Sequence, residues 1–296
     1  MSASDDPGAA GRVALNRPHK RAKPLRRRLH DIAFGLSVIA LVSPAALVFL
    51  WMLSLSLKTE IDNIAFPPIF IPSPPTLDNF RAVFERNDFL NQTLNSVIVS
   101  FGATGIALLV GIPAGYGIAK MRANKAAVLI LIARITPGLS YLIPLFLLFQ
   151  WIGLTGTIWP IVITHLVLTV PIAVWVMIGF FEGLPPELEE AALVDGATIW
   201  QAFRHVALPL ARPGITVATI LAFIFSWNNF IFAMVLAGRE TRTLPVAVNN
   251  MLTFEQISWG PLSAAALLVT LPVVVLTLVA QKQIVAGLTQ GGVKGG

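Results

Sequence analysis

Long apolar runs with almost no charge constrain this chain more than any other feature. The first, residues 32–57, is 26 residues without Asp, Glu, Lys or Arg. A helix needs about 20 apolar residues to cross the hydrocarbon core of a membrane, and only a helix satisfies its own backbone there. Five further runs cover residues 94–119, 126–152, 158–181, 215–237 and 262–280. The sequence therefore predicts an all-α integral membrane protein with six transmembrane helices.

The distribution of Lys and Arg predicts the orientation of these spans. If the N-terminus is cytoplasmic, fifteen of these residues lie on the cytoplasmic side and five on the other. Cytoplasmic segments of membrane proteins carry such an excess, so both termini are expected in the cytoplasm. The pI near 10.1 could suggest nucleic acid. Most of the excess charge lies in the N-terminal arm, however, so membrane topology explains it and no nucleic-acid partner is expected.

The runs and the charges divide the chain into five parts. Residues 32–57 could be confused with a signal peptide because basic residues precede them, but 26 residues exceed the apolar region of such a peptide. They are predicted to be an uncleaved first span. The predicted parts are a basic cytoplasmic arm (1–31), the first span (32–57), an extracytoplasmic loop with an interfacial helix at 76–87 (58–93), a core with the other five spans (94–281) and a cytoplasmic tail (282–296).

The loop at residues 184–213, between the fourth and fifth spans, reads as a helix–turn–helix. Pro186 can begin a helix, because a proline at the first position loses no hydrogen bond. Asp195-Gly196 predicts a turn. Thr198 and Gln201 match a capping box that opens a second helix, which Pro209 is expected to end. A plain connection would be shorter and more polar, so this unit is expected to dock on a separate partner.

The spacing within this loop carries a family resemblance. Glu190-Ala191-Ala192, then Gly196, then an apolar segment ending in Leu208-Pro209, resembles the EAA loop of ABC importer permeases. Two other segments, residues 225–230 and the tail at 287–295, are similar to those of carbohydrate importer permeases of the maltose-permease-like group. In the first of these, Asn229 stands where that group usually has an acidic residue.

The resemblance implies a type I ABC importer permease fold in a bacterial plasma membrane. It implies a second permease subunit as partner in a heterodimer, two copies of an ATP-binding subunit, and an extracytoplasmic solute-binding protein, with membrane lipid around the spans. The chain would be a passive permease rather than an enzyme, with no cofactor or metal. The residues expected to couple it to the ATPase are Glu190, Ala191, Ala192, Asp195, Gly196, Phe203, Leu208 and Pro209.

Polar side chains inside the spans are candidates for the substrate path. Trp227, Asn228 and Asn229 combine an aromatic face with amides, as sugar recognition requires, and Asn95 is a further candidate. The alternative is hydrogen bonding between helices, which membrane proteins also use. Arg134 is a lone charge within a span, for which capping by helix-end carbonyls is favoured over a functional role. His165 is expected to be satisfied in packing.

The rival function is that of an ion-coupled secondary carrier. Such a carrier would normally place Asp or Glu inside the membrane. All 15 acidic residues of this chain lie outside the six apolar runs. The sequence therefore favours a permease driven by a separate ATPase, for a carbohydrate or a related polyol or glycoside.

Overall fold

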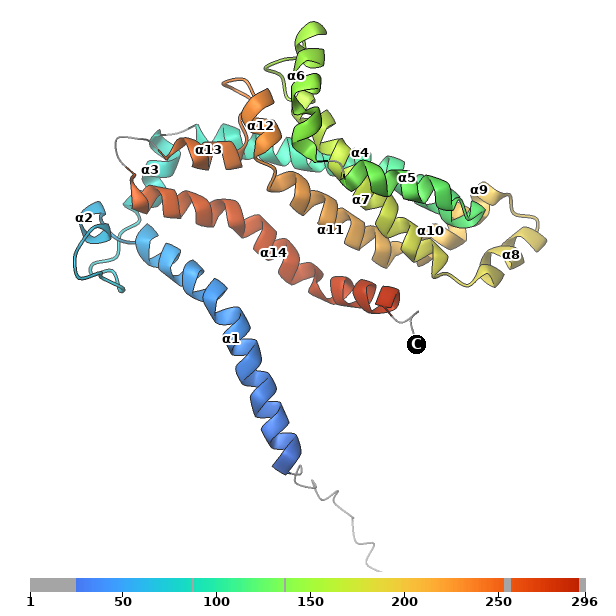
Figure 1. Cartoon of the computed structure of the whole chain (residues 1–296), viewed down its shortest axis with the longest axis horizontal. Coiled ribbons are helices and arrows are strands. Elements are labelled where there is room, and N and C mark those ends of the chain that lie inside the picture. The colour runs from blue at the N-terminus through green and yellow to red at the C-terminus, as the bar shows by residue number, and fades with distance from the viewer. Residues whose placement is uncertain (1–24, 87, 136, 253–256, 293–296) are drawn as a thin grey trace, which may run out of the picture. The chain divides into compact units, whose positions relative to one another are not determined.

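A computed structural model describes residues 25–86, 88–135, 137–252 and 257–292, without the side chains of residues 25–32, 86, 134 and 282–292. It divides into two units, residues 1–49 and 50–296. Every regular element described is helical (Figure 1). The longer helices are α1 (Leu25–Ser56), α3 (Asp78–Arg86), α4 (Phe89–Met121), α5 (Asn124–Ile135), α6 (Leu142–Trp151), α7 (Trp159–Glu182), α8 (Pro186–Val194), α11 (Arg212–Trp227) and α14 (Trp259–Gly292).

Shorter helices connect them. These are α2 (Glu60–Asn63), the 3₁₀ turn η1 (Gly138–Tyr141), α9 (Ile199–Ala202), the π-helix η2 (Phe203–Ala207), α10 (Leu208–Leu210), α12 (Ile231–Leu236) and α13 (Leu244–Asn250). Four helices of the described chain are long and apolar enough to cross a membrane, and the number is six if each of two bent pairs is one span. The prediction of an all-α membrane protein is confirmed.

Two of the predicted spans are not single straight helices. In the run at 126–152, α5 and the η1–α6 segment meet at an angle of 81° next to Pro137. The run at 215–237 was predicted as one span, but α11 ends at Trp227 and α12 begins at Ile231. The second bent pair instead joins Ile199–Leu210 to α11, at 73°. Prolines and side-chain capping interrupt these helices, and apolar content alone does not reveal such interruptions.

The ends of the chain also differ from the predicted boundaries. Helix α1 begins at Leu25, so the last residues of the predicted arm are helical, and residues 1–24 lie outside the described part. Helix α14 continues to Gly292, well past the predicted end of the last span at 280. A helix can therefore carry the final span directly into the predicted tail.

The core of the second unit is the close pairing of α4 with α7, against which α11 packs (Figure 1). Gly111 and Gly115, spaced as in the small-xxx-small motif, face α7. A Cβ atom at Gly115 would lie 2.6 Å from the Met177 Cβ, and one at Gly111 would lie 2.7 Å from the Ala173 Cβ. The two backbones therefore approach so closely that these positions require glycine, which makes α4 and α7 a closely packed pair.

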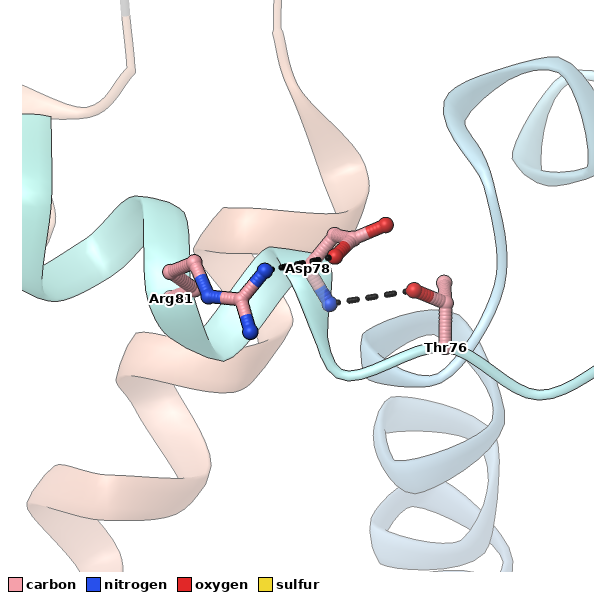
Figure 2. Close-up of polar contacts among 3 residues, drawn as sticks. All are labelled: Thr76, Asp78 and Arg81. Carbon is pink, nitrogen blue, oxygen red and sulfur yellow. Dashed lines mark hydrogen bonds and ion pairs between the residues drawn. The ribbon is translucent and has the colours of Figure 1, made fainter.

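The interfacial helix predicted at 76–87 is present as α3. Thr76 Oγ1 accepts from the Asp78 backbone N–H (3.1 Å), and Asp78 forms an ion pair with Arg81 at 3.5 Å (Figure 2). Both charged side chains are well exposed, so this pair contributes little stability. On the opposite side Val83 is fully buried, and α3 contacts α14. A helix with one exposed and one buried face is thus present, and its position at the membrane interface stays a prediction.

The segment between α1 and α3 is fixed by buried polar groups. Asn79 Nδ2 donates to the carbonyl oxygens of Ser56 (3.0 Å) and Lys58 (2.6 Å). Lys58 Nζ donates to the Ile69 carbonyl at 2.6 Å and lies 4.4 Å from the centre of the Trp51 ring. Burial lowers the pKa of Lys58, and the nearby Asp62 opposes that shift. These contacts hold the proline-rich segment against the end of α1.

Candidate functional site

The loop at 184–213 folds as its local chemistry predicts. Pro186 is the first residue of α8. Gly196 has φ +88°, which L-residues rarely adopt, so the turn after α8 requires glycine. Thr198 and Gln201 form a complete capping box at the start of α9. The loop lies at one end of the group formed by α4, α7 and α11, and α12, α13 and α3 lie toward the other (Figure 1).

The path into α11 differs from the prediction at Pro209. The helix does not end there, because α9 continues through the π-helix η2 into α10, and Pro209 lies in the first turn of α10. A proline inside a continuing helix removes one backbone donor, and this helix ends one residue later, at Leu210. The sharp bend follows at Ala211, between α10 and α11.

The outward side of this loop is apolar although it is exposed. Val194 is 87% and Trp200 61% exposed, and Ile199, Leu188 and Leu193 are exposed as well. We call these five residues the exposed apolar patch. Large apolar side chains gathered on a short loop mark an interaction surface. Among the predicted coupling residues, Glu190, Ala191, Asp195 and Gly196 are also exposed, and Ala192 is half-buried.

The inward side packs on the ends of α4 and α7. Phe203 is buried, with its ring centre 4.6 Å from that of Tyr116 and 6.2 Å from that of Phe181. Leu208 belongs to the same apolar cluster, and Pro209 is half-buried. The predicted coupling residues therefore separate into an outward group and an inward group.

The structure adds one carboxylate that the sequence reading did not single out. Glu189 is only 7% exposed, although it precedes Glu190 directly. Its Oε2 accepts a hydrogen bond from the Tyr116 hydroxyl at 2.7 Å and lies 3.1 Å from Lys120 Nζ. A polar groove of about 550 Å³ extends from these residues past Arg122 and Glu182. The i, i+4 spacing of Tyr116 and Lys120 at the end of a span was the available signal.

The candidates around Trp227 form the break between α11 and α12. Trp227 is 3% exposed, and its Nε1 donates to the Val269 carbonyl of α14 at 2.9 Å. The exposed Asn228 bonds back to the Ile224 carbonyl of its own helix, whereas Asn229 Oδ1 accepts from the Phe232 N–H at 3.3 Å and so begins α12. The position of Trp227 fits the helix-packing alternative, and Asn228 has the most accessible side chain of the three.

Asn95 lies elsewhere, at the N-terminal part of α4. It is 8% exposed, and its Nδ2 donates to the carbonyl oxygens of Glu240 (2.7 Å) and Arg242 (3.0 Å). These bonds hold the loop between α12 and α13 against α4. The structure therefore does not bring Asn95 together with the residues around Trp227.

The structure tests the expectation for His165 but not the one for Arg134. His165 is buried, and its Nδ1 lies 2.8 Å from the Ser226 hydroxyl on α11, whereas its Nε2 is buried with no hydrogen-bond partner among the described residues, so the expected satisfaction is met at one ring nitrogen only. Arg134 belongs to α5, but its side chain lies outside the described residues. Its predicted capping stays a prediction.

Comparisons with known proteins agree on one family. Residues 107–290 match the family model described as "Binding-protein-dependent transport system inner membrane component". The chain is similar to the trehalose transport system permease protein SugB of Mycobacterium tuberculosis, at 38% identity over 86% of this chain and 94% of the relative. It is also similar to the sulfoquinovosyl glycerol transport system permease protein SmoH of Agrobacterium fabrum, at 32% identity over 92% and 94% of the two chains.

Solved structures support the same fold. A chain of a bacterial ABC transporter involved in the import of the acidic polysaccharide alginate superimposes with a TM-score of 0.70. The alignment covers 89% of this chain and 98% of that one, at 20% sequence identity. This similarity establishes the fold alone.

Proposed function

The chain belongs to the family of binding-protein-dependent transport system inner membrane components, and from that premise we propose that it carries a sugar or glycoside into the cell. It is a multi-pass inner-membrane permease of an ABC importer, not the ATPase. The cargo proposal is supported by the relatives, whose names refer to trehalose, sulfoquinovosyl glycerol and diacetylchitobiose. Each of these is a sugar or a sugar derivative.

The observation that carries the coupling proposal is the exposed apolar patch beside Glu190. Exposed apolar side chains such as Trp200 and Val194 are costly to leave in water and are suited to a partner's groove. We assign that groove to the ATP-binding subunit, present in two copies. Glu190 then makes a polar contact at the rim, Ala191 and Ala192 allow close approach, and Asp195-Gly196 sets the turn. Phe203, Leu208 and Pro209 connect the docked unit to the spans.

The assembly and its orientation follow from the same assignment. With the loop at 184–213 in the cytoplasm, both termini are cytoplasmic, and the segment with α3 faces the solute-binding protein outside. A second permease subunit supplies the other half of the pathway. The positive-inside count supports this orientation.

The substrate path is proposed to pass the break between α11 and α12. Backbone that is not helical at membrane depth persists only where protein buries it or where it lines a water-filled cavity. Asn228 is exposed there, so we assign its amide to the path and Asn229 to the support of the break. Trp227 and Asn95 then hold the walls in place through their bonds to neighbouring backbone.

The test is uptake by the whole complex in liposomes. The chain is purified with its second permease and ATP-binding subunits, and the solute-binding protein is added with radiolabelled trehalose, diacetylchitobiose or maltose. ATP inside the liposomes should drive uptake of at least one sugar, and a proton gradient without ATP should not. Uptake driven by the proton gradient alone would establish the rival carrier function. A labelled amino-acid mixture is added in parallel, and ATP-driven uptake confined to it would overturn the carbohydrate assignment.

A further inference from the structure

The buried carboxylate of Glu189 has no part in the docking surface described above. It faces inward from α8, whereas Glu190 is exposed. Its partners Tyr116 and Lys120 come from α4, some 70 residues earlier in the chain. A buried carboxylate is costly unless charge and hydrogen bonds compensate it. The two contacts supply both, so the arrangement is a specific connection between α8 and α4.

We propose that Glu189, Tyr116 and Lys120 form a joint that transmits movement of the docked loop to the transmembrane core. This inference rests on the proposed coupling function and assigns Glu189 as a positioning residue within it. The joint ends on α4, which is one continuous helix of 33 residues. Through Gly111 and Gly115, α4 is packed closely on α7. A displacement of α8 is therefore passed to two spans at once.

Movement of the loop could instead pass along the backbone from α9 to α11. The geometry of that segment is less suited to transmitting a displacement. From α9 the chain passes through a π-helix and a bend of 73° before α11 begins. Bends and π-helices are places where a helix yields to displacement. The side-chain joint instead connects α8 directly to α4, which continues without a break from Phe89 to Met121. Hence the joint, and not the loop backbone alone, sets how far α4 follows α8.

The aromatic cluster beneath the joint fixes its direction. The Tyr116 ring lies 5.3 Å from Phe181 and 4.6 Å from Phe203, which leaves its hydroxyl aimed at Glu189. Replacing Tyr116 by Phe removes the hydrogen bond and keeps the ring. Glu189→Gln keeps an acceptor for the hydroxyl but loses the ion pair, so it separates the two contacts.

The experiment uses the complete complex and compares ATP hydrolysis with uptake of the sugar that the wild-type complex imports. Glu189→Ala should lower uptake about tenfold, within the range of coupled sites, while ATP hydrolysis changes less than about twofold. Glu189→Gln should restore part of the uptake, and the exposed Glu187→Gln on the same helix should behave as wild type. Tyr116→Phe should add little to Glu189→Ala, because both changes remove the same hydrogen bond.

A second measurement does not depend on the cargo. The chain contains no cysteine, so spin labels can be placed on α8 at Glu187→Cys and on α4 at the exposed Met121→Cys. In the otherwise wild-type complex, the label distance should stay narrow with and without trapped ATP, and Glu189→Ala should broaden it. If the wild-type complex hydrolyses ATP but imports no sugar, the cargo proposal fails while the label distances still test the joint. Unchanged distances and uptake in Glu189→Ala, or loss of the ATPase from that complex, would overturn the joint.

Discussion

The N-terminal and C-terminal ends of α4 each hold a loop from a later part of the chain, and their chemistry differs. At the N-terminal end, Asn95 donates to two backbone carbonyls, and Ser96 Oγ accepts from the Leu244 N–H at 2.7 Å. At the C-terminal end, Tyr116 and Lys120 meet the carboxylate of Glu189. One end uses neutral bonds to backbone, and the other uses a charge and side chains alone.

The two ends of α4 differ in how costly their contacts are to break. Bonds to backbone carbonyls fix the path of the chain between α12 and α13, and breaking them leaves buried groups unsatisfied. The Lys120 side chain is 40% exposed, so its ion pair with Glu189 is exchangeable with water at small cost. Breaking the contacts at the N-terminal end of α4 is therefore costly, whereas at the C-terminal end the exposed ion pair contributes little and the buried bond from Tyr116 is the main contact of the proposed joint.

The largest effect is expected from a change where α4 packs most closely on α7. In Gly115→Ala the new Cβ would lie 2.6 Å from the Met177 Cβ and 3.2 Å from the Ile178 backbone nitrogen. Overpacking of this kind costs about 1–3 kcal/mol. We expect a clear loss of thermal stability in detergent. Gly117→Ala is the matched control, because its Cβ meets nothing within 4 Å; equal melting temperatures would show that α4 and α7 can separate.

A change at Asn95 tests the N-terminal end. Asn95→Asp places a carboxylate against the Glu240 and Arg242 carbonyls and removes the donor, so it should destabilise the protein by about 2–3 kcal/mol. Asn95→Ala should cost less. The more exposed Asn91 makes a single 2.9 Å bond to the Glu240 carbonyl, and Asn91→Asp should change the melting temperature little. If both aspartates were equally harmful, the buried pair of bonds would not be what fixes this end.

Gly196 tests whether the position of α8 matters apart from the joint. At φ +88° an alanine costs about 1–2 kcal/mol, and the strain should turn α8 away from its docking direction. We expect several-fold lower uptake in Gly196→Ala, with the contacts of Glu189 intact. Gly179→Ala is the control, since its Cβ meets nothing within 4 Å. Wild-type uptake in Gly196→Ala would mean that the turn is not part of the coupling geometry.

The sequence predicted the features that arise from local chemistry. The apolar runs, the first residue of α8 at Pro186, the turn at Gly196 and the capping box at Thr198 all depend on neighbours within a few residues. The sequence reading missed the helix breaks at Pro137 and at residues 228–230. Hydropathy gives the length of an apolar run, but it does not show whether the helix is interrupted within that run. A broken and an unbroken helix of the same residues have the same apolar content.

The missed part of the candidate site depends on contacts distant in sequence. Glu189 and Glu190 are adjacent acids in an acidic turn, and nothing local distinguishes them. Only the fold, which brings α8 within reach of Tyr116 and Lys120 on α4, buries the first and leaves the second exposed. In the same way, the buried position of Trp227 depends on the Val269 carbonyl in the last helix.

The smallest effect is expected from the exposed partner at the C-terminal end. Lys120→Met removes the 3.1 Å ion pair but keeps the buried hydrogen bond from Tyr116 to Glu189. Half-exposed pairs contribute about 0–1 kcal/mol, so uptake should stay within about twofold of wild type. Uptake by the wild-type complex should also change little with moderate salt. Salt screens only the exposed ion pair, which contributes little to the joint. Uptake measured in parallel for Lys120→Met and Tyr116→Phe shows which contact of Glu189 matters more, the ion pair or the hydrogen bond. If Lys120→Met lowered uptake as much as Tyr116→Phe, the ion pair would contribute as much to the joint as the buried hydrogen bond. The expected order of the two contacts would then be wrong.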